Sequence, residues 1–557
     1  MRRHVYSITT LLLLATIVQT YVAWRAIVPA QDAVRFVALA QRIETHGLRE
    51  AWRESEQAPF AALVACVHRP RRWEPWAPTT GMNCVNWATS AQVAAAIPAV
   101  LSVVPVYLLL TLWLGGRSAL LGSILFCLCP SVARLGGDGL CDSTHLLLAA
   151  GSLALAMAYL RRLTSPPADE NRRWSVEVSL AIACGMLWAA AVLVRPEALV
   201  LAPAIWASVA IACWGRASGT VIPRVVVSLG CFVLAAVGTF AIQTRFTNTS
   251  TAPLATFSRM FSHDQVPRPD IVNDGVADDW RLANGRPMAF PFKEYTTTSR
   301  FHGLLSAAGE MFNELPQTLG WATLPMAVAT MWWRRRHWRI PPEFMQWAVL
   351  VLVVCSATWY AASVGYLSAR HLVLGVVPVV GWSGWGCRIA CRGLAKKMRF
   401  PSTGKGSAWS IFRHMVIRPS VVAVLLGVAA LATIDLPLHA SRIAHRRTAR
   451  WLNGGERAPG AILDTRGWTM LYSDRPTYRY DEAPVALLDP ALAYIVVEQR
   501  DLDFDSPRGR TLREVLIRGG TRRAVLPGPV GQPGKAVLVY RWNATRFAHT
   551  VADVLAN

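Results

Sequence analysis

Long apolar runs are the feature that most constrains this chain. A helix needs ~20 apolar residues to cross the hydrocarbon core of a bilayer, and the sequence contains eleven runs of about that length. Hydrophobic residues make up 53% of the chain, and its mean hydropathy is +0.31. Soluble domains are typically ~45–50% apolar, so we predict a polytopic α-helical membrane protein. The predicted spans are residues 7–29, 88–113, 117–135, 143–160, 176–194, 197–214, 222–243, 316–333, 344–364, 371–390 and 416–438.

Basic residues lie in short clusters between these runs. The formal net charge is +23, and the stretch from Arg388 to Arg418 holds eight Lys and Arg residues without one acid. Short basic connectors stay on the cytoplasmic side of a membrane. The clusters lie in the even-numbered connectors. These connectors are cytoplasmic if the N-terminus is cytoplasmic and the first run is an uncleaved span. We therefore expect a multi-pass protein of the cytoplasmic (inner) membrane, and no nucleic-acid partner.

The tail differs from the rest of the chain and indicates a small α/β fold. Short apolar runs at 461–463, 494–497 and 536–540 predict buried strands, and 506–518 has a helical pattern. The predicted organisation is a membrane domain at 1–438, with outward loops at 30–87 and 244–315 and a basic cytoplasmic linker at 391–415, followed by an extracytoplasmic α/β domain at 439–557.

The first outward loop begins with a polar group directly after a span. Asp32 precedes Phe36, Ala40 and Ile43, whose spacing predicts an amphipathic helix lying along the membrane surface. Asp32 is either the N-cap of that helix or a general base at the membrane edge. The same loop contains Cys66 and would extend to Cys84; whether the two form a disulfide is left open by the sequence.

A glycine-rich turn before the fourth span carries two more acids. Asp138 and Asp142 fit a turn and a helix cap. Alternatively, these two carboxylates hold an acceptor, a sugar or a divalent cation such as Mg²⁺ or Mn²⁺. No cysteine spacing matches a zinc pattern, and no cofactor is certain.

Cations also lie where apolar runs begin or end on the predicted outward side. Arg195 and Glu197 flank Pro196, and this proline marks either a tight hairpin between two spans or a break in a single region. Arg370 and His371 lie together at the start of another run. These side chains either extend to the interface or bind a lipid phosphate through charge-assisted hydrogen bonds. No Walker loop or nucleophile elbow accompanies them, which argues against a nucleotide-driven pump or a hydrolase.

In their order along the chain, these features resemble the glycosyltransferase C superfamily, in particular protein O-mannosyltransferases and lipid A aminoarabinose transferases. The resemblance covers roughly residues 1–390. The family often has an Asp-Glu pair in the first loop. This sequence departs from that pattern, because Ala33 follows Asp32. The motifs of the resemblance are Asp32 with the following helix to Gly47, Ala58-Pro59-Phe60, the turn from Asp138 to Asp142, Val194-Arg195-Pro196-Glu197-Ala198-Leu199, and Tyr366-Leu367-Ser368-Ala369-Arg370-His371 before Pro378.

The resemblance implies transfer of a sugar from a polyprenyl-phosphate donor to a lipid, glycan or protein acceptor at the outer membrane face, with inversion. Asp32 would be the general base, and Asp138 or Asp142 would position the acceptor, the sugar or a metal. Arg195, Arg370 and His371 would stabilise the leaving phosphate, supported by Glu197. Two other interpretations stay open: a transporter or flippase of a lipid-linked or small polar substrate, and a membrane scaffold that displays the tail.

Overall fold

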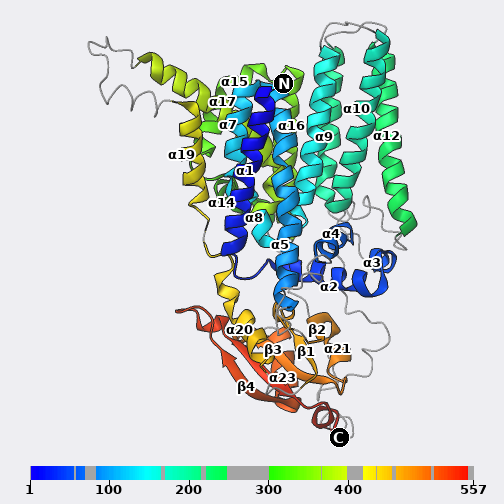
Figure 1. The fold of residues 1–557 in the computed structure, drawn as a ribbon, viewed down its shortest axis with the longest axis vertical. Coiled ribbons are helices and arrows are strands. Elements are labelled where there is room, and N and C mark those ends of the chain that lie inside the picture. Colours follow the sequence, from blue (N-terminus) through cyan, green and yellow to red (C-terminus); the bar gives the residue numbers. More distant parts are fainter. Residues whose placement is uncertain are drawn as a thin grey trace.

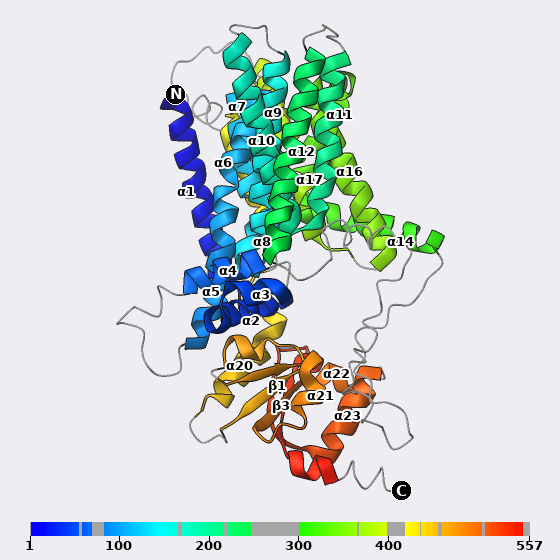
Figure 2. The same cartoon turned by 90° about the vertical axis from the view of Figure 1, so that its right-hand side faces the viewer.

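The chain is a polytopic α-helical membrane protein with a small sheet near its C-terminus. A computed structural model describes it, and the helices stand side by side above the sheet (Figures 1 and 2). The described residues are 2–54, 58–68, 83–164, 170–214, 221–246, 300–364, 367–397, 418–434, 436–454, 459–473, 475–503 and 507–549. The apolar helices are α1 (Arg2–Arg25), α5 (Asn83–Leu101), α6 (Val103–Leu114), α7 (Gly116–Cys127), α8 (Pro130–Asp138), α9 (Asp142–Thr164), α10 (Glu170–Val194), α11 (Leu201–Trp214), α12 (Val221–Phe246), α14 (Arg300–Leu319), α15 (Leu324–Arg334), α16 (Pro341–Val364), α17 (Val373–Lys397) and α19 (Pro419–Leu431).

The described residues do not confirm the eleven spans that the sequence predicts. Within the described ranges, eight helical segments are long and apolar enough to cross a bilayer, or nine if the bent pair α7 and α8 is one span. These two helices meet at 48°. The predicted spans 316–333 and 416–438 are not among them, because the first is divided between α14 and α15 and the second contains only the 13-residue α19.

Gly320 explains why the predicted span 316–333 is divided. Its φ is +80°, and a Cβ at this position would lie 2.4 Å from the Cβ of Ala430. A left-handed residue ends a helix, and glycine adopts this conformation without steric cost. The helix that ends here, α14, begins at Arg300 and so occupies the end of the predicted loop 244–315. Residues 247–299 of that loop, and 398–415 of the predicted linker, lie outside the described residues.

The chain makes a tight hairpin at Arg195, as one of the two alternatives predicted. Arg195 has an extended backbone with φ −151° and ψ 127°, and the short helix η2 (Pro196–Val200) follows and leads into α11. A residue before proline is disfavoured in the helical conformation. Helix α10 therefore ends at Val194.

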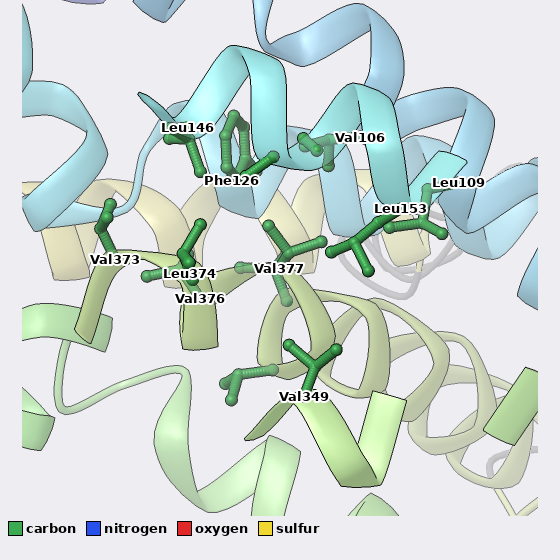
Figure 3. Packing of buried hydrophobic residues seen from close by; sticks show 14 of the residues in the cluster. Val106, Leu109, Phe126, Leu146, Leu153, Val349, Val373, Leu374, Val376 and Val377 are labelled. Carbon is green, nitrogen blue, oxygen red and sulfur yellow. The ribbon is translucent and has the colours of Figure 1, made fainter. Parts of the chain in front are cut away.

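Apolar side chains from five helices pack in the centre of the bundle. Figure 3 shows Val106 of α6, Phe126 of α7, Leu146 of α9, Val349 of α16 and Val377 of α17, all fully buried, directed toward one another. Such packing gives many small van der Waals contacts. It holds the ends of α9 and α17 in fixed positions, and these ends carry the polar residues described below.

Three short helices follow the first span and lie between the bundle and the sheet (Figure 2): α2 (Gln31–His46), α3 (Leu48–Glu54) and α4 (Ala58–His68). The amphipathic helix predicted after Asp32 is therefore present as α2. Its Phe36 is buried and meets Phe60 of α4 edge to face at 4.8 Å between ring centroids. Cys66 of α4 is exposed and forms no disulfide with any described residue, whereas the side chain of Cys84 lies outside the described part.

The C-terminal part forms a five-stranded sheet in the order β2-β1-β3-β5-β4. Strands β1, β2 and β3 are parallel to one another, and β5 is antiparallel to β3 and β4. The elements are α20 (Ile443–Leu452), β1 (Ala461–Asp464), η7 (Thr469–Leu471), β2 (Thr477–Arg479), η8 (Tyr480–Glu482), α21 (Ala483–Ala486), β3 (Leu492–Glu498), α22 (Gln499–Asp503), α23 (Pro507–Gly519), β4 (Gly520–Leu526), η9 (Pro533–Lys535) and β5 (Val537–Trp542).

The sheet lies at the end of the bundle opposite the N-terminus (Figure 1), and we call this the sheet end. It contacts the link between α1 and α2. The Tyr472 hydroxyl donates to the carbonyl oxygen of Ile27 at 3.1 Å, and Arg442 of η6 (Ala440–Arg442) donates to that of Pro29 at 2.8 Å. The sheet is therefore attached to the segment that carries Asp32.

Candidate active site

Two predicted site residues, far apart in the sequence, form an ion pair at the sheet end. The carboxylate of Asp32 in the first turn of α2 accepts a hydrogen bond from Arg370 of η5 (Ala369–Leu372). Their side chains are 52% and 33% exposed. Water and a substrate can reach both charges, so this pair is open to exchange with a ligand.

Asp32 is not the N-cap of α2. The cap residue is Ala30, with an extended backbone and no capping side chain, and its N–H donates to the carbonyl oxygen of Asp138 at 3.0 Å. The helix starts two residues earlier than the capping interpretation requires, and the hydrogen bond to Asp138 fixes the chain at Ala30. The N-cap interpretation is therefore wrong, and the Asp32 carboxylate is directed to Arg370 instead.

A second, buried group of charges forms where α9 begins and α10 ends. Arg195 forms ion pairs with Asp142 and with Glu197, whose Oε1 lies 2.5 Å from Nη2 of Arg195. Asp142 is only 2% exposed and Arg195 12%. A buried charge is costly unless it is paired. This group therefore keeps the hairpin after α10 attached to the start of α9.

Both groups surround the turn at Cys141. Burial raises the pKa of this thiol to about 11, and the charges of Arg195, Glu197, Arg370 and Asp32 all act on it. Four predicted site residues, together with Asp142 beside Cys141, therefore converge on one turn. The sequence indicated that they share a membrane face, and the structure brings them together.

His371 lies beside Arg370 and has a fixed tautomer. Its Nδ1 accepts the backbone N–H of Ser368 at 3.2 Å, and its ring lies 4.7 Å from that of Tyr360. Because Nδ1 accepts a hydrogen bond, the proton of the neutral ring is on Nε2. His371 can therefore donate a hydrogen bond from Nε2.

Asp138 is not part of the group around Cys141. It is the last residue of α8, and its Oδ1 lies 2.8 Å from Nε2 of His439 in the link between α19 and the sheet. The carboxylate of Asp142 already forms an ion pair with Arg195. In the ranges that the structure describes, no three His, Cys, Asp or Glu side chains are grouped to hold a metal. The predicted pairing of Asp138 with Asp142 around a cation does not fit this donor set.

Sequence analysis missed two polar residues beside these groups. Glu314 of α14 has a raised pKa because burial disfavours its charge, although the backbone of Ala369 and the charge of Arg134 oppose that shift. His439 is the partner of Asp138. Glu314 falls at the end of a predicted loop and His439 after the last predicted span, and neither position has a motif that would have indicated it.

An apolar pocket adjoins η5 between α14, α16 and α17. It begins directly after His371 and continues toward the middle of the bundle. Its lining residues are Leu315, Thr318, Leu319, Leu350, Val353, Val354, Leu372, Gly375 and Val379. The site thus has a polar part around Arg370 and an apolar part next to it.

Solved structures of membrane glycosyltransferases share this fold. ArnT from Cupriavidus metallidurans in the apo state is 12% identical over 97% of this chain and 98% of its own, with a TM-score of 0.55. The same protein bound to undecaprenyl phosphate is 13% identical over the same shares, with a TM-score of 0.53. The oligosaccharyltransferase AglB from Archaeoglobus fulgidus, in complex with an inhibitory peptide and a dolichol-phosphate, is 12% identical over 93% of this chain and 73% of its own, with a TM-score of 0.50.

No family model matches the sequence, and no curated protein is similar to it in sequence. The structural likeness extends over nearly the whole chain and includes the bundle and the C-terminal sheet. The chain therefore shares its fold with ArnT and with the oligosaccharyltransferase AglB, in agreement with the resemblance found in its sequence.

Proposed function

We propose that this protein transfers a sugar from a polyprenyl-phosphate donor to an acceptor hydroxyl or amine at the sheet end of the bundle. The observation that carries this proposal is the half-exposed pair of Asp32 and Arg370 beside an apolar pocket. A base, a phosphate-binding cation and a place for an isoprenoid chain are what such a reaction needs. The fold is shared with proteins bound to undecaprenyl phosphate and dolichol-phosphate.

Arg370 and His371 are the proposed phosphate ligands. A guanidinium makes charge-assisted hydrogen bonds to phosphate, and Nε2 of His371 supplies a further donor. Both stabilise the charge that develops on the lipid phosphate as the sugar leaves. Arg195 already binds two carboxylates, so we assign it, with Asp142 and Glu197, to positioning the turn at Cys141 instead of to binding the phosphate.

Asp32 is the proposed general base. When a donor phosphate binds Arg370, this cation exchanges one anion for another and the Asp32 carboxylate is released. The acceptor then attacks the anomeric carbon and gives its proton to Asp32, while the bond from that carbon to the phosphate oxygen breaks. The lipid phosphate leaves with the electron pair, and direct displacement inverts the anomeric centre.

The proposed location is the cytoplasmic membrane, with the N-terminus inside and the sheet end outside. The basic connectors support this orientation. Polar residues of a transporter usually lie near the bilayer midplane, whereas Asp32, Arg195 and Arg370 lie at one end of the bundle. The arrangement therefore favours surface chemistry over transport.

The test is transfer by purified protein in liposomes that contain radiolabelled polyprenyl-phosphate sugars, one sugar at a time, with a lipid and glycan extract as the acceptor source. We expect label to leave one donor and appear in an acceptor. Movement of intact donor across the bilayer without label transfer would instead establish a flippase. Repeating the assay after EDTA treatment tests whether the reaction needs a divalent cation.

A further inference from the structure

The C-terminal sheet has a topological switch point at the carboxyl ends of β1 and β3. Strand β1 lies between β2 and β3, and all three are parallel. The chain passes from β1 to β2 on one side and then to β3 on the other, so the connections diverge between β1 and β3. In open α/β sheets, ligands bind outside the carboxyl ends of the strands at this switch point.

Basic side chains from four separate segments gather at these strand ends. Arg466 follows β1, Arg500 follows β3, Lys535 precedes β5 and Arg442 ends η6, and all four are half-buried. The N–H of Gln499 donates to the carbonyl oxygen of Ala536 at 2.9 Å, which holds the segments of Arg500 and Lys535 together. We call these four residues the strand-end basic cluster.

The carboxylates in this cluster are already bound. Glu498 accepts hydrogen bonds from Arg500 and, at 3.0 Å, from His445, and Arg466 lies 3.8 Å from its Oε2. Burial alone would raise the pKa of Glu498, but these hydrogen bonds and charges hold it at about 2. Asp501 accepts two hydrogen bonds from Arg466. Asp464, the last residue of β1, accepts the backbone N–H groups of Arg466 and Thr469. Four cations therefore lie near three carboxylates, and positive charge is in excess.

Arg442 and Lys535 carry this excess, because neither forms an ion pair with any described residue. Burial and the nearby charges of Arg500 and Arg134 lower the pKa of Arg442 to about 10, against the opposing effect of Asp138 and Glu498. Burial, with Arg500 as the next cause, also lowers the pKa of Lys535. Burial is the largest cause of both shifts, because a cation that is removed from water is disfavoured.

Arg442 is held in place for a ligand. Its guanidinium lies 4.3 Å from the ring centroid of Trp468 and donates to the carbonyl oxygen of Pro29 at 2.8 Å. A guanidinium that is oriented in advance loses less entropy when it binds an anion.

We propose that the strand-end basic cluster binds a phosphate group, with Arg442 and Lys535 as its principal ligands. Phosphate matches the fork geometry of a guanidinium and takes the compact charge of a lysine as well. The group can belong to a lipid headgroup or to a free or sugar phosphate, and the experiment below distinguishes these sources.

The cluster is close to the candidate active site. A Cβ at Gly467, next to Arg466, would lie 2.8 Å from Cγ1 of Val34, which is two residues from Asp32 on α2. The cluster therefore adjoins the helix that carries Asp32. That a phosphate bound here belongs to the acceptor rests on the proposed function, whereas the binding itself does not.

The test is equilibrium dialysis of the full chain in phosphatidylcholine nanodiscs against radiolabelled inorganic phosphate. We expect saturable binding by the wild type, and binding at least about tenfold weaker in Arg442→Gln and in Lys535→Gln, which corresponds to ~1.4 kcal/mol. Arg450→Gln is the matched control, because Arg450 is exposed on α20 outside the cluster. Thermal unfolding of each variant shows whether it is folded.

A second arm uses nanodiscs that contain phosphatidylglycerol. If lipid headgroups occupy the cluster, they will reduce phosphate binding by the wild type; unchanged binding indicates a free or sugar phosphate. The proposal is overturned if the wild type binds no phosphate saturably in phosphatidylcholine, or if all three variants bind it equally well. Neither result depends on turnover, so failure here leaves the proposed sugar transfer unaffected.

Discussion

Asp32 and Arg370 neutralise each other in a position that water reaches. An exposed ion pair contributes only ~0–1 kcal/mol to stability, so little is lost when a ligand separates it. Arg195 and Asp142 differ from this pair because they are buried. At the scale of single residues, the site therefore combines one exchangeable pair with one fixed group.

Replacing Arg370 tests the phosphate role. Arg370→Gln removes a charge-assisted hydrogen-bond donor, and such bonds contribute ~1.5–3 kcal/mol. We expect KM for the donor to rise by roughly 10- to 150-fold. Steady-state kinetics with varied donor concentration measures this, and Arg49→Gln is the control, because Arg49 is exposed on α3. An unchanged KM and kcat in Arg370→Gln would remove this residue from donor binding.

Replacing Arg195 tests the positioning role. Arg195→Gln leaves the 2% exposed carboxylate of Asp142 without its cation, and breaking a buried pair costs ~3–5 kcal/mol. We expect a lower thermal unfolding midpoint in detergent. The double variant Asp142→Asn/Arg195→Gln should recover part of the loss, since it removes the buried charge. Equal midpoints for wild type and Arg195→Gln would contradict a structural role for the group.

The sequence indicated which residue types lie at the sheet end, but not their partners. Asp32 and Arg370 could be selected because each adjoins an apolar run. Their pairing could not, because it joins positions 338 residues apart. Asp138 was grouped with Asp142 by proximity in the chain, whereas its carboxylate binds His439, which lies after the last membrane helix. Such contacts depend on how distant helices pack.

At the scale of elements, apolar runs predicted most spans because length and hydropathy decide whether a helix can cross a bilayer. They failed where a backbone feature interrupts a run. Gly320 and the contact with Ala430 divide one predicted span, and composition alone does not reveal a close contact between two helices. Strands β1, β3 and β5 were predictable because short apolar runs between polar turns are typical of buried strands. Strands β2 and β4 were not predicted, because neither is a buried apolar run.

The end of β3 gives a pH-dependent prediction. The folded pKa of Glu498 is about 2 and its ordinary value is 4.5, so its charged form stabilises the fold above about pH 4.5. This contribution, up to ~3 kcal/mol, decreases as the pH falls from 4.5 toward 2.

Calorimetry between pH 7 and pH 3 tests this linkage. The unfolding midpoint of the wild type should fall below pH 4.5, and that of Glu498→Gln should be lower at pH 7 and depend less on pH. Glu514→Gln is the control, because the i,i+4 pair of Glu514 with Arg518 on α23 leaves the Glu514 side chain 33% exposed. The same pH dependence in Glu498→Gln as in the wild type would show that another group dominates.

For the whole molecule, the fold separates two ends. The N-terminus lies at one end of the bundle, and α2 and the sheet lie at the other (Figure 1). Asp32 belongs to α2, and Arg370 forms its ion pair with Asp32. In the proposed topology, which rests on the basic connectors, the first end lies in the cytoplasm. The candidate active site and the strand-end basic cluster therefore share one side of the membrane.

Labelling of intact cells tests this orientation. The native cysteines are first replaced by serine, because Cys66 is exposed at the sheet end. In that background, Arg450→Cys should react with a membrane-impermeant maleimide from outside, whereas Arg335→Cys, in the basic segment after α15, should react only after lysis. The reverse pattern would invert the proposed topology and place the chemistry in the cytoplasm.

The most direct test of the central claim is the rate of sugar transfer by Asp32→Asn at saturating donor. General-base catalysis contributes ~10²–10⁴-fold, so we predict a decrease of that size in kcat with an unchanged unfolding midpoint. Glu50→Gln, an exposed acid on neighbouring α3, should keep the wild-type rate. Wild-type turnover by purified Asp32→Asn would contradict the assignment of Asp32 as the catalytic base.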